Sequence, residues 1–118
     1  MFDFEKFPVY QESELFYSEV FKIFQNNKIS KDIQDQLKRA AMSIVLNIAE
    51  GAGKYSKKDK KNFYVIARGS PNECVALLRI LKIEGIVNDK QYIILYNKLL
   101  NIGKMLSGLI NSMMSIEK

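Results

Sequence analysis

The sequence predicts an all-α fold: an antiparallel, up-and-down four-helix bundle in which residues 1–118 form a single domain. Apolar residues recur every three or four positions through most of the chain, and no segment shows the two-residue alternation of a strand. The chain has 118 residues and only two prolines. Short polar segments separate the periodic ones, and connections this short make consecutive helices antiparallel.

The first helix is expected from Pro8 to about Gln25. Proline suits the first helical position, because its missing N–H would have no helical partner there. One face of this helix is predicted to be buried, and it consists of Val9, Ser13, Phe16, Val20 and Ile23 together with Phe24. The amide-rich residues 25–28 then interrupt the helical pattern.

The second helix is expected to begin after the cap residue Ser30 and to end at Gly51. Gly51 and Gly53 are predicted to stop it by taking left-handed backbone angles. Its buried face is predicted to hold Leu37, Ala41, Ile44 and Ile48, and a polar line beside that face holds Arg39, Ser43, Asn47 and Glu50. An apolar and a polar line on one helix indicate two different partners.

The third helix is expected to begin after the cap residue Ser56 and to stop at Gly85. Its buried face is predicted to hold Phe63, Ile66, Ala67, Ser70, Leu77, Leu78 and Leu81. Within it, the segment 70–73 has the form of a helix start, with a serine cap, proline at the first position and glutamate three residues after the cap. These local signals alone predict that two helices meet at Gly69–Ser70.

The fourth helix is expected to begin after Asn88 and carries two apolar lines at heptad spacing. The first line holds Tyr92, Leu95, Leu99, Ile102, Leu106, Leu109 and Met113. The second holds Ile93, Tyr96, Leu100, Gly103, Ser107, Ile110 and Met114. One line suffices for an intramolecular core, so the second predicts self-association. The alternative is a wide monomeric core that covers both lines.

Positive charge is concentrated in the central hairpin. Between Lys38 and Arg68 there are eight cations and two anions, whereas the rest of the chain has ten cations and eleven anions. The turn contributes Lys54, Lys57, Lys58, Lys60 and Lys61, with Asp59 as its single acid. Such a patch is typical of a surface that binds RNA, DNA or another polyanion. The alternative is a solvated turn that serves solubility only.

Catalysis is not expected. The chain has no histidine, which is the commonest general base and metal ligand, and no carboxylate pair or phosphate-binding glycine loop is present. Cys74 is predicted to be a small buried apolar residue. No cofactor or metal is expected. The sequence contains neither a membrane-spanning apolar segment nor the features of a signal peptide, and we expect a cytoplasmic protein.

Two motifs carry a family resemblance. The first is Ser43-Ile-x-x-Asn47-Ile-Ala-Glu50-Gly51, and the second is Ala67-Arg68-Gly69-Ser70-x-x-Glu73. Together with the opening at residues 4–11 and the segment 36–41, they resemble the bacterial four-helix-bundle family named after the protein encoded in 23S rRNA intervening sequences. That family is in turn similar to the accessory variability determinant of diversity-generating retroelements, a pentameric barrel that binds nucleic acid and a reverse transcriptase.

The resemblance implies a continuous third helix and a homo-oligomer, with a pentamer as the expected form. Pro71 departs from the family pattern, so we expect one helix with a kink at Gly69–Pro71. Possible partners are RNA or DNA and a protein such as a reverse transcriptase.

The motif positions carried over are Arg39, Asn47, Glu50, Gly51, Arg68, Ser70 and Glu73. Under one interpretation, the two arginines act with the lysine cluster on phosphates. Under the other, the polar motif residues form hydrogen-bonded pairs that hold helices or subunits together. Antiparallel packing of the hairpin is expected to place Glu50 near Lys57 and Arg39 near Arg68.

Two functions follow. The first is a non-enzymatic oligomer that binds nucleic-acid backbones through the hairpin cations. Tyr55 and Tyr64 are near enough to stack on bases, although Tyr64 is expected to lie in the core. The second is a scaffold or adaptor whose surfaces serve only self-assembly and a protein partner.

Overall fold

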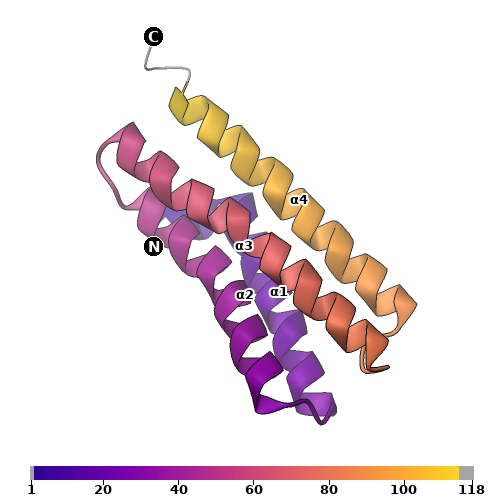
Figure 1. Cartoon of the computed structure of the whole chain (residues 1–118). Helices are drawn as coiled ribbons and strands as arrows, with labels where there is room; N and C mark the ends of the chain where they lie inside the picture. Colours follow the sequence, from indigo (N-terminus) through magenta and orange to yellow (C-terminus); the bar gives the residue numbers. More distant parts are fainter. Residues whose placement is uncertain (1, 115–118) are drawn as a thin grey trace.

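The computed structural model describes residues 2–114, and four long helices run side by side through them (Figure 1). A short 3-10 helix, η1, covers Asp3–Lys6. The bundle helices are α1 (Pro8–Asn26), α2 (Lys31–Ala52), α3 (Lys57–Ile83) and α4 (Asp89–Met114). No strand occurs in this part of the chain. The predicted all-α bundle is therefore confirmed.

Each helix packs against its neighbours around the bundle. The contact between α2 and α3 is the most extensive, and the contact between α1 and α4 is the smallest. The molecule measures 49 × 25 × 22 Å along its principal axes. Because consecutive helices are antiparallel, the α2–α3 turn lies at one end, and the α1–α2 and α3–α4 turns lie at the other (Figure 1).

The predicted cap residues begin three of the helices. The Ser30 hydroxyl accepts a hydrogen bond from the Ile33 N–H, and the Ser56 hydroxyl accepts one from the Asp59 N–H. At the start of α4 the bonds are reciprocal: the Gln91 N–H donates to the Asn88 side chain, and the Asn88 N–H donates to the Gln91 side chain. These side chains satisfy N–H groups that have no helical partner.

The third helix is continuous through Pro71, and the local prediction of two helices is wrong. Ala67, Pro71, Cys74 and Leu78 are all buried. They recur at helical spacing, so a single helix is needed to bury all four on one face. The energy of this burial outweighs the local start signal at Ser70. A kink at Gly69–Pro71 stays a prediction.

The glycines at the end of α2 do not act as predicted. Helix α2 continues to Ala52, and Gly53 has ordinary right-handed angles, with φ −83° and ψ −5°. Gly51 is instead required by packing, since a Cβ there would lie 2.7 Å from Cε1 of Tyr64 and 3.1 Å from Cβ of Phe63. In contrast, Gly85 follows α3 with φ +77° and ends it as expected.

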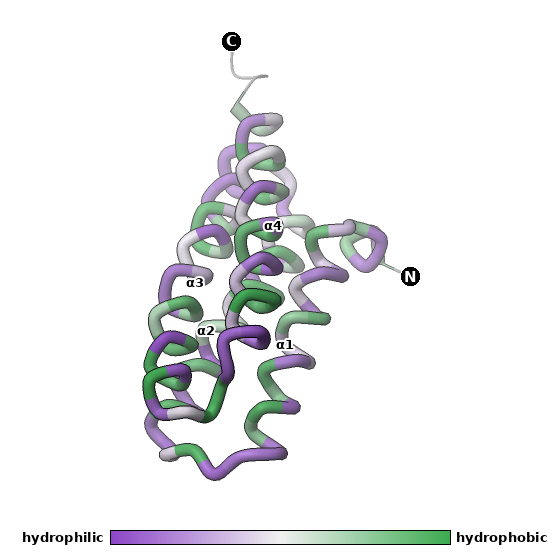
Figure 2. Tube along the Cα trace, turned by 90° about the vertical axis from the view of Figure 1, so that its right-hand side faces the viewer, coloured by the Kyte–Doolittle hydropathy of each residue, from purple (hydrophilic) through white to green (hydrophobic). Residues whose placement is uncertain are grey.

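The predicted core face is confirmed in α2 and, except for the partly buried Phe24, in α1. Most of the predicted face of α3 is buried. Ile66 is an exception: it is 52% exposed, because the buried face of α3 is centred on Ala67 and Cys74. In α4, the middle of the first apolar line lies in the core. The second line stays largely exposed apart from Ile110. Hydrophobic and hydrophilic residues accordingly alternate along each helix (Figure 2).

Candidate nucleic-acid interface

The hairpin of α2 and α3 positions the predicted basic surface, and close packing fixes its register. Near the turn, Gly51 lies against the ring of Tyr64. Further along, the hydroxyl groups of Ser43 and Ser70 form a hydrogen bond of 2.9 Å. The two contacts agree with a single antiparallel register of α2 and α3.

A polar network extends from the contact between the two serines. The Asn47 amide donates to the Ser43 carbonyl at 2.8 Å and lies 3.1 Å from the Ser43 hydroxyl. The Ser70 hydroxyl is also 3.2 Å from the Ile66 carbonyl. The network joins the two sequence motifs across the helix interface. For Ser70, this geometry matches the interpretation in which motif residues hold helices together, whereas both hydrogen bonds of Asn47 stay within α2.

The register overturns two expected proximities. With Ser43 opposite Ser70, Arg39 and Arg68 are displaced in opposite directions and lie roughly 9 Å apart along the bundle axis. Glu50 pairs instead with Lys54, at 3.8 Å between Nζ and Oε2. The expectation was wrong because α2 continues to Ala52, beyond its expected end at Gly51. Each α2 residue therefore lies opposite a later residue of α3 than expected.

Two of the predicted lysines contribute to the structure of the turn. Lys60 Nζ donates to the carbonyl oxygen of Ala52 at 2.8 Å and so caps the carboxyl end of α2. Lys54 Nζ lies 5.1 Å from the ring centroid of Phe63, besides its contact with Glu50. These two side chains are therefore partly committed to internal contacts.

The other cations of α3 follow one edge of the helix. Lys57, Lys61, Arg68 and Arg79 are separated by four, seven and eleven residues, close to one, two and three helical turns. This edge extends over roughly 33 Å, while the acids of α3, Asp59 and Glu73, lie on another side. Arg79 was not among the predicted site residues, although its spacing could have revealed it. Lys58 is exposed beside this edge.

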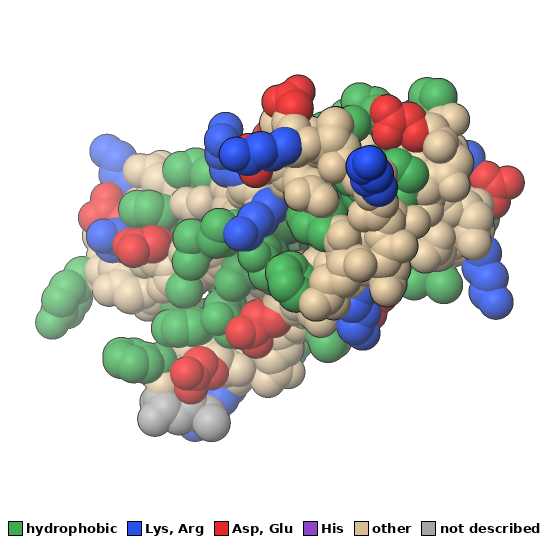
Figure 3. All heavy atoms as spheres, turned by 90° about the horizontal axis from the view of Figure 1, so that it is seen from below, with side chains coloured by type: hydrophobic (Ala, Val, Ile, Leu, Met, Phe, Trp, Pro, Cys, Tyr) green, Lys and Arg blue, Asp and Glu red, His purple; other side chains and the backbone are tan. Residues whose placement is uncertain are grey.

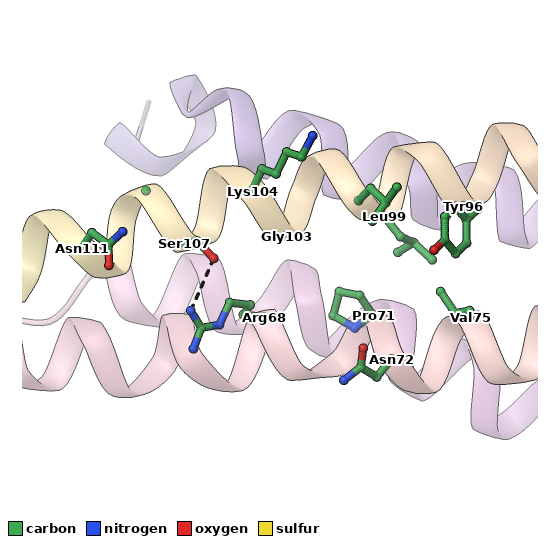
Figure 4. Close-up of a pocket in the computed structure, with 12 residues that line it drawn as sticks. Arg68, Pro71, Asn72, Val75, Tyr96, Leu99, Gly103, Lys104, Ser107 and Asn111 are labelled. Atoms are coloured by element: carbon green, nitrogen blue, oxygen red, sulfur yellow. Dashed lines mark hydrogen bonds between the residues drawn. The ribbon is translucent and has the colours of Figure 1, made fainter.

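Arg68 lies where the basic edge meets α4. Its Nη1 donates to the hydroxyl of Ser107 at 3.4 Å (Figure 4). Arg39, in contrast, is exposed on α2 roughly 20 Å from the hairpin tip. No ion pair within residues 2–114 involves Arg39 or Glu73. The structure therefore brings Arg68, but not Arg39, to the edge that begins with the turn lysines.

The remaining candidates divide into an exposed and a buried set. Tyr55 is fully exposed in the turn, whereas Tyr64 is buried in the core as expected. Burial raises the pKa of the Tyr64 hydroxyl. Cys74 is also buried, and this burial, with a smaller contribution from Glu73, raises the pKa of its thiol to about 12. The thiol is therefore protonated and unreactive at neutral pH.

Acids, cations and exposed hydrophobic side chains are intermixed on the surface that Figure 3 shows from below. None of the helices between residues 2 and 114 is both long and apolar enough to span a membrane.

Comparisons with known proteins agree with the architecture. The chain resembles a crystal structure from Bacteroides thetaiotaomicron that is described as a protein with unknown function from the S23 ribosomal protein family. The two share 27% identity with a TM-score of 0.79, over 86% of this chain and 97% of the other. No curated protein matches. The model of the 23S rRNA-intervening sequence protein family matches residues 5–108, and the chain therefore belongs to that family.

Proposed function

We propose that this protein is a non-enzymatic oligomer that binds the phosphate backbone of RNA or DNA through the basic edge of α3 and the adjoining turn. The observation that carries the proposal is the alignment of Lys57, Lys61, Arg68 and Arg79 on one edge, with Lys58 beside it. Side-chain cations along a rigid helix suit a regularly charged polymer, and contacts to phosphates do not depend on base sequence.

The direct test is fluorescence anisotropy with a labelled random RNA and a labelled DNA duplex at several salt concentrations. The variant replaces Lys57, Lys58 and Lys61 by glutamine. Lys54 and Lys60 are left unchanged because both make contacts within the turn. Each lost phosphate contact reduces the slope of log K against log salt by about 0.9 for duplex DNA, so we expect a decrease of about two to three.

A matched control removes the same charge from the opposite end of the bundle. Lys28, Lys31 and Lys90 are exposed there, near the α1–α2 and α3–α4 turns. Their replacement by glutamine is expected to leave the slope nearly unchanged. Equal losses in the two triple variants would indicate a response to net charge alone and would contradict a defined binding edge.

The oligomer belongs to the same proposal, and the family resemblance makes a homopentamer its expected form. Five chains of 13.6 kDa have a mass of about 68 kDa. Light scattering on the protein as it elutes from a sizing column measures this mass directly. A mass of 13.6 kDa at micromolar concentration would contradict self-association.

A scaffold without nucleic-acid binding is the second candidate function. The exposed apolar side chains of α4, among them Ile93, Ile94 and Leu100, favour it, because they offer surface to a protein partner. In that case, adding the protein at low salt changes the anisotropy of neither the labelled RNA nor the labelled DNA, while the oligomer persists.

A further inference from the structure

A groove of about 730 Å³ runs between α3 and α4 (Figure 4). Apolar side chains from both helices line it: Pro71, Val75, Leu99 and Leu100. On α4 the lining extends from Tyr96 to Asn111, which is roughly 22 Å of helix. The groove is therefore elongated, and an extended chain matches its shape better than a compact molecule does.

The charged side chains that line the groove are both cations. Arg68 contributes from α3 and Lys104 from α4, whereas no acid of residues 2–114 lines it. Both cations are exposed, and neither forms an ion pair within the described part of the chain. The single acid of α4, Asp89, lies outside the lining and pairs with Lys82 at 3.3 Å. The groove therefore favours a negatively charged occupant.

Arg79 adds a third cation near one end of the groove. Arg68 meets Ser107 across the antiparallel pair of helices, at 3.4 Å. Arg79 is eleven residues after Arg68 on α3, and Tyr96 is eleven residues before Ser107 on α4. Arg79 therefore lies level with Tyr96, roughly 16 Å from Arg68 along the bundle. Positive charge thus follows the length of the groove, as contacts to a chain of phosphates require.

The groove also offers an aromatic ring. Tyr96 lines it and is 38% exposed. In Figure 4, its side chain extends from α4 toward the α3 side of the groove, near Val75. Aromatic side chains stack on the faces of nucleobases with little dependence on base identity. A basic groove that contains an exposed aromatic ring is typical of surfaces that bind single-stranded nucleic acid.

An unpaired strand can use both features of the groove, whereas a duplex can use only its charge. In a duplex the faces of the bases stack on one another and are not free for an aromatic ring. The axes of packed helices lie about 8–10 Å apart. A groove between two such helices is too narrow to hold a double helix, whose major groove alone is about 12 Å wide.

We propose that the α3–α4 groove binds an unpaired strand of RNA or DNA, with Arg68, Arg79 and Lys104 on phosphates and Tyr96 stacked on a base. This inference rests on the proposed nucleic-acid binding and specifies the form of the nucleic acid. It adds contacts to the bases, which the basic edge of α3 alone does not provide.

Other apolar surface of α4 lies outside the groove. Ile93, Ile94 and Met114 are exposed and do not belong to its lining. They remain available to another subunit, so binding of a strand in the groove is compatible with the proposed oligomer.

Filling the groove tests the proposal without changing its charge. Gly103 and Gly108 line the groove, and a Cβ added at either one meets nothing within 4 Å. The variant is Gly103→Leu with Gly108→Leu, and the probes are labelled oligo(dT), oligo(rU) and a DNA duplex in fluorescence anisotropy. Loss of one stacked base is expected to weaken binding of both single strands about tenfold or more, while duplex binding stays unchanged. Gly69→Leu, outside the groove and also in free space, is the control and should change neither.

A second pair of variants tests the stacking contact. Tyr96→Ala removes the ring and is expected to weaken binding of the single strands about 5- to 150-fold, which corresponds to 1–3 kcal/mol for one stacked base. Tyr96→Phe keeps the ring and is expected to retain the affinity. A loss that is equal for the duplex and the single strands would indicate a structural effect and would contradict stacking.

Lys104→Gln separates the groove from the basic edge of α3, because Lys104 belongs to α4. For single strands, the slope of log K against log salt is expected to decrease by about 0.7, the value for one phosphate contact. The slope for the duplex should stay the same. Lys90→Gln, at an exposed position on the same helix but outside the groove, is the matched control.

The outcomes distinguish this inference from the proposed function. If none of the probes binds at low salt, the proposed function fails. If the duplex binds and the single strands keep their affinity in both the filled-groove and the Tyr96→Ala variants, only the groove proposal fails. Light scattering on each variant adds a further check, since a changed oligomer mass would place the groove in a subunit contact and overturn the proposal.

Discussion

The α2–α3 hairpin and the α1–α4 contact differ in how closely their helices are joined. In the hairpin, Gly51 leaves room for the ring of Tyr64. The hydrogen-bond network of Ser43, Asn47 and Ser70 also connects the two helices. The contact between α1 and α4 is much smaller, and the partly exposed pair of Glu12 and Lys98, at 3.7 Å, is its ion pair.

This difference separates two roles within one small bundle. The hairpin is a rigid support for the cations of α3, since its register is set by buried contacts that tolerate little displacement. The first and last helices share less surface with each other, and α4 exposes five large hydrophobic side chains, those of Ile93, Ile94, Tyr96, Leu100 and Met114. Under the proposed self-association, the part of this apolar surface that lies outside the α3–α4 groove is available to another subunit.

The largest expected effect concerns Cys74, which reports whether the hairpin side of the core opens. Burial raises the pKa of its thiol from 9.0 to about 12, so the thiolate fraction in the native state falls roughly a thousand-fold. We expect an aromatic disulfide reagent at pH 8 to modify Cys74 slower by about this factor than in urea. Similar rates in the two conditions would mean that this part of the core opens readily.

The same pKa shift predicts a loss of stability in alkaline solution. Because the folded state favours the neutral thiol, the raised pKa of Cys74 stabilises the folded state fully below the ordinary pKa of 9.0. This stabilisation disappears as pH rises through about 12. Urea unfolding across this range measures the change. In Cys74→Ala the free energy of unfolding should depend less on pH. The dependence that remains should come from Tyr64, whose pKa is also raised.

Gly51→Val tests the close approach of α2 and α3. The new side chain must displace Tyr64 or Phe63, and overpacking of this kind costs about 1–3 kcal/mol in the free energy of unfolding. Gly69→Ala is the matched control on the open side of α3, where helix propensity should add up to about 1 kcal/mol of stability. Equal effects of the two substitutions would remove the steric explanation.

Ser70→Ala tests the polar network between the two motifs. Loss of its hydrogen bonds is expected to reduce the free energy of unfolding by about 0.5–1.5 kcal/mol. The exposed Ser18 of α1 provides a comparison, because Ser18→Ala reports the propensity gain alone. A Ser70→Ala variant as stable as Ser18→Ala would show that the network contributes nothing measurable.

The smallest effect is expected at the α1–α4 contact. Lys98→Met removes the ion pair with Glu12, in which both side chains are partly exposed, and should change the free energy of unfolding by less than about 1 kcal/mol. The difference should decrease further in high salt. A larger loss, independent of salt, would mean that this contact is as specific as the hairpin.

Sequence reasoning reached most of the fold because its signals are local. The cap residues Ser30, Ser56 and Asn88 and the periodic apolar faces specify four helices, and helix ends and faces depend mainly on nearby residues. The concentration of cations in the hairpin could also be read directly from the sequence. The family motifs lie on α2 and α3, but the pairs expected from them, Glu50 with Lys57 and Arg39 with Arg68, are not the ones that meet.

Only the tertiary structure determined the register of the hairpin and the consequences of that register. It placed Arg68 beside α4, left Arg39 apart, committed Lys54 and Lys60 to the turn, and assigned Gly51 to packing. It also made α3 continuous through Pro71. The reason is that helix periodicity is a property of one segment, whereas register and continuity depend on contacts between segments, whose burial energy outweighs local preference.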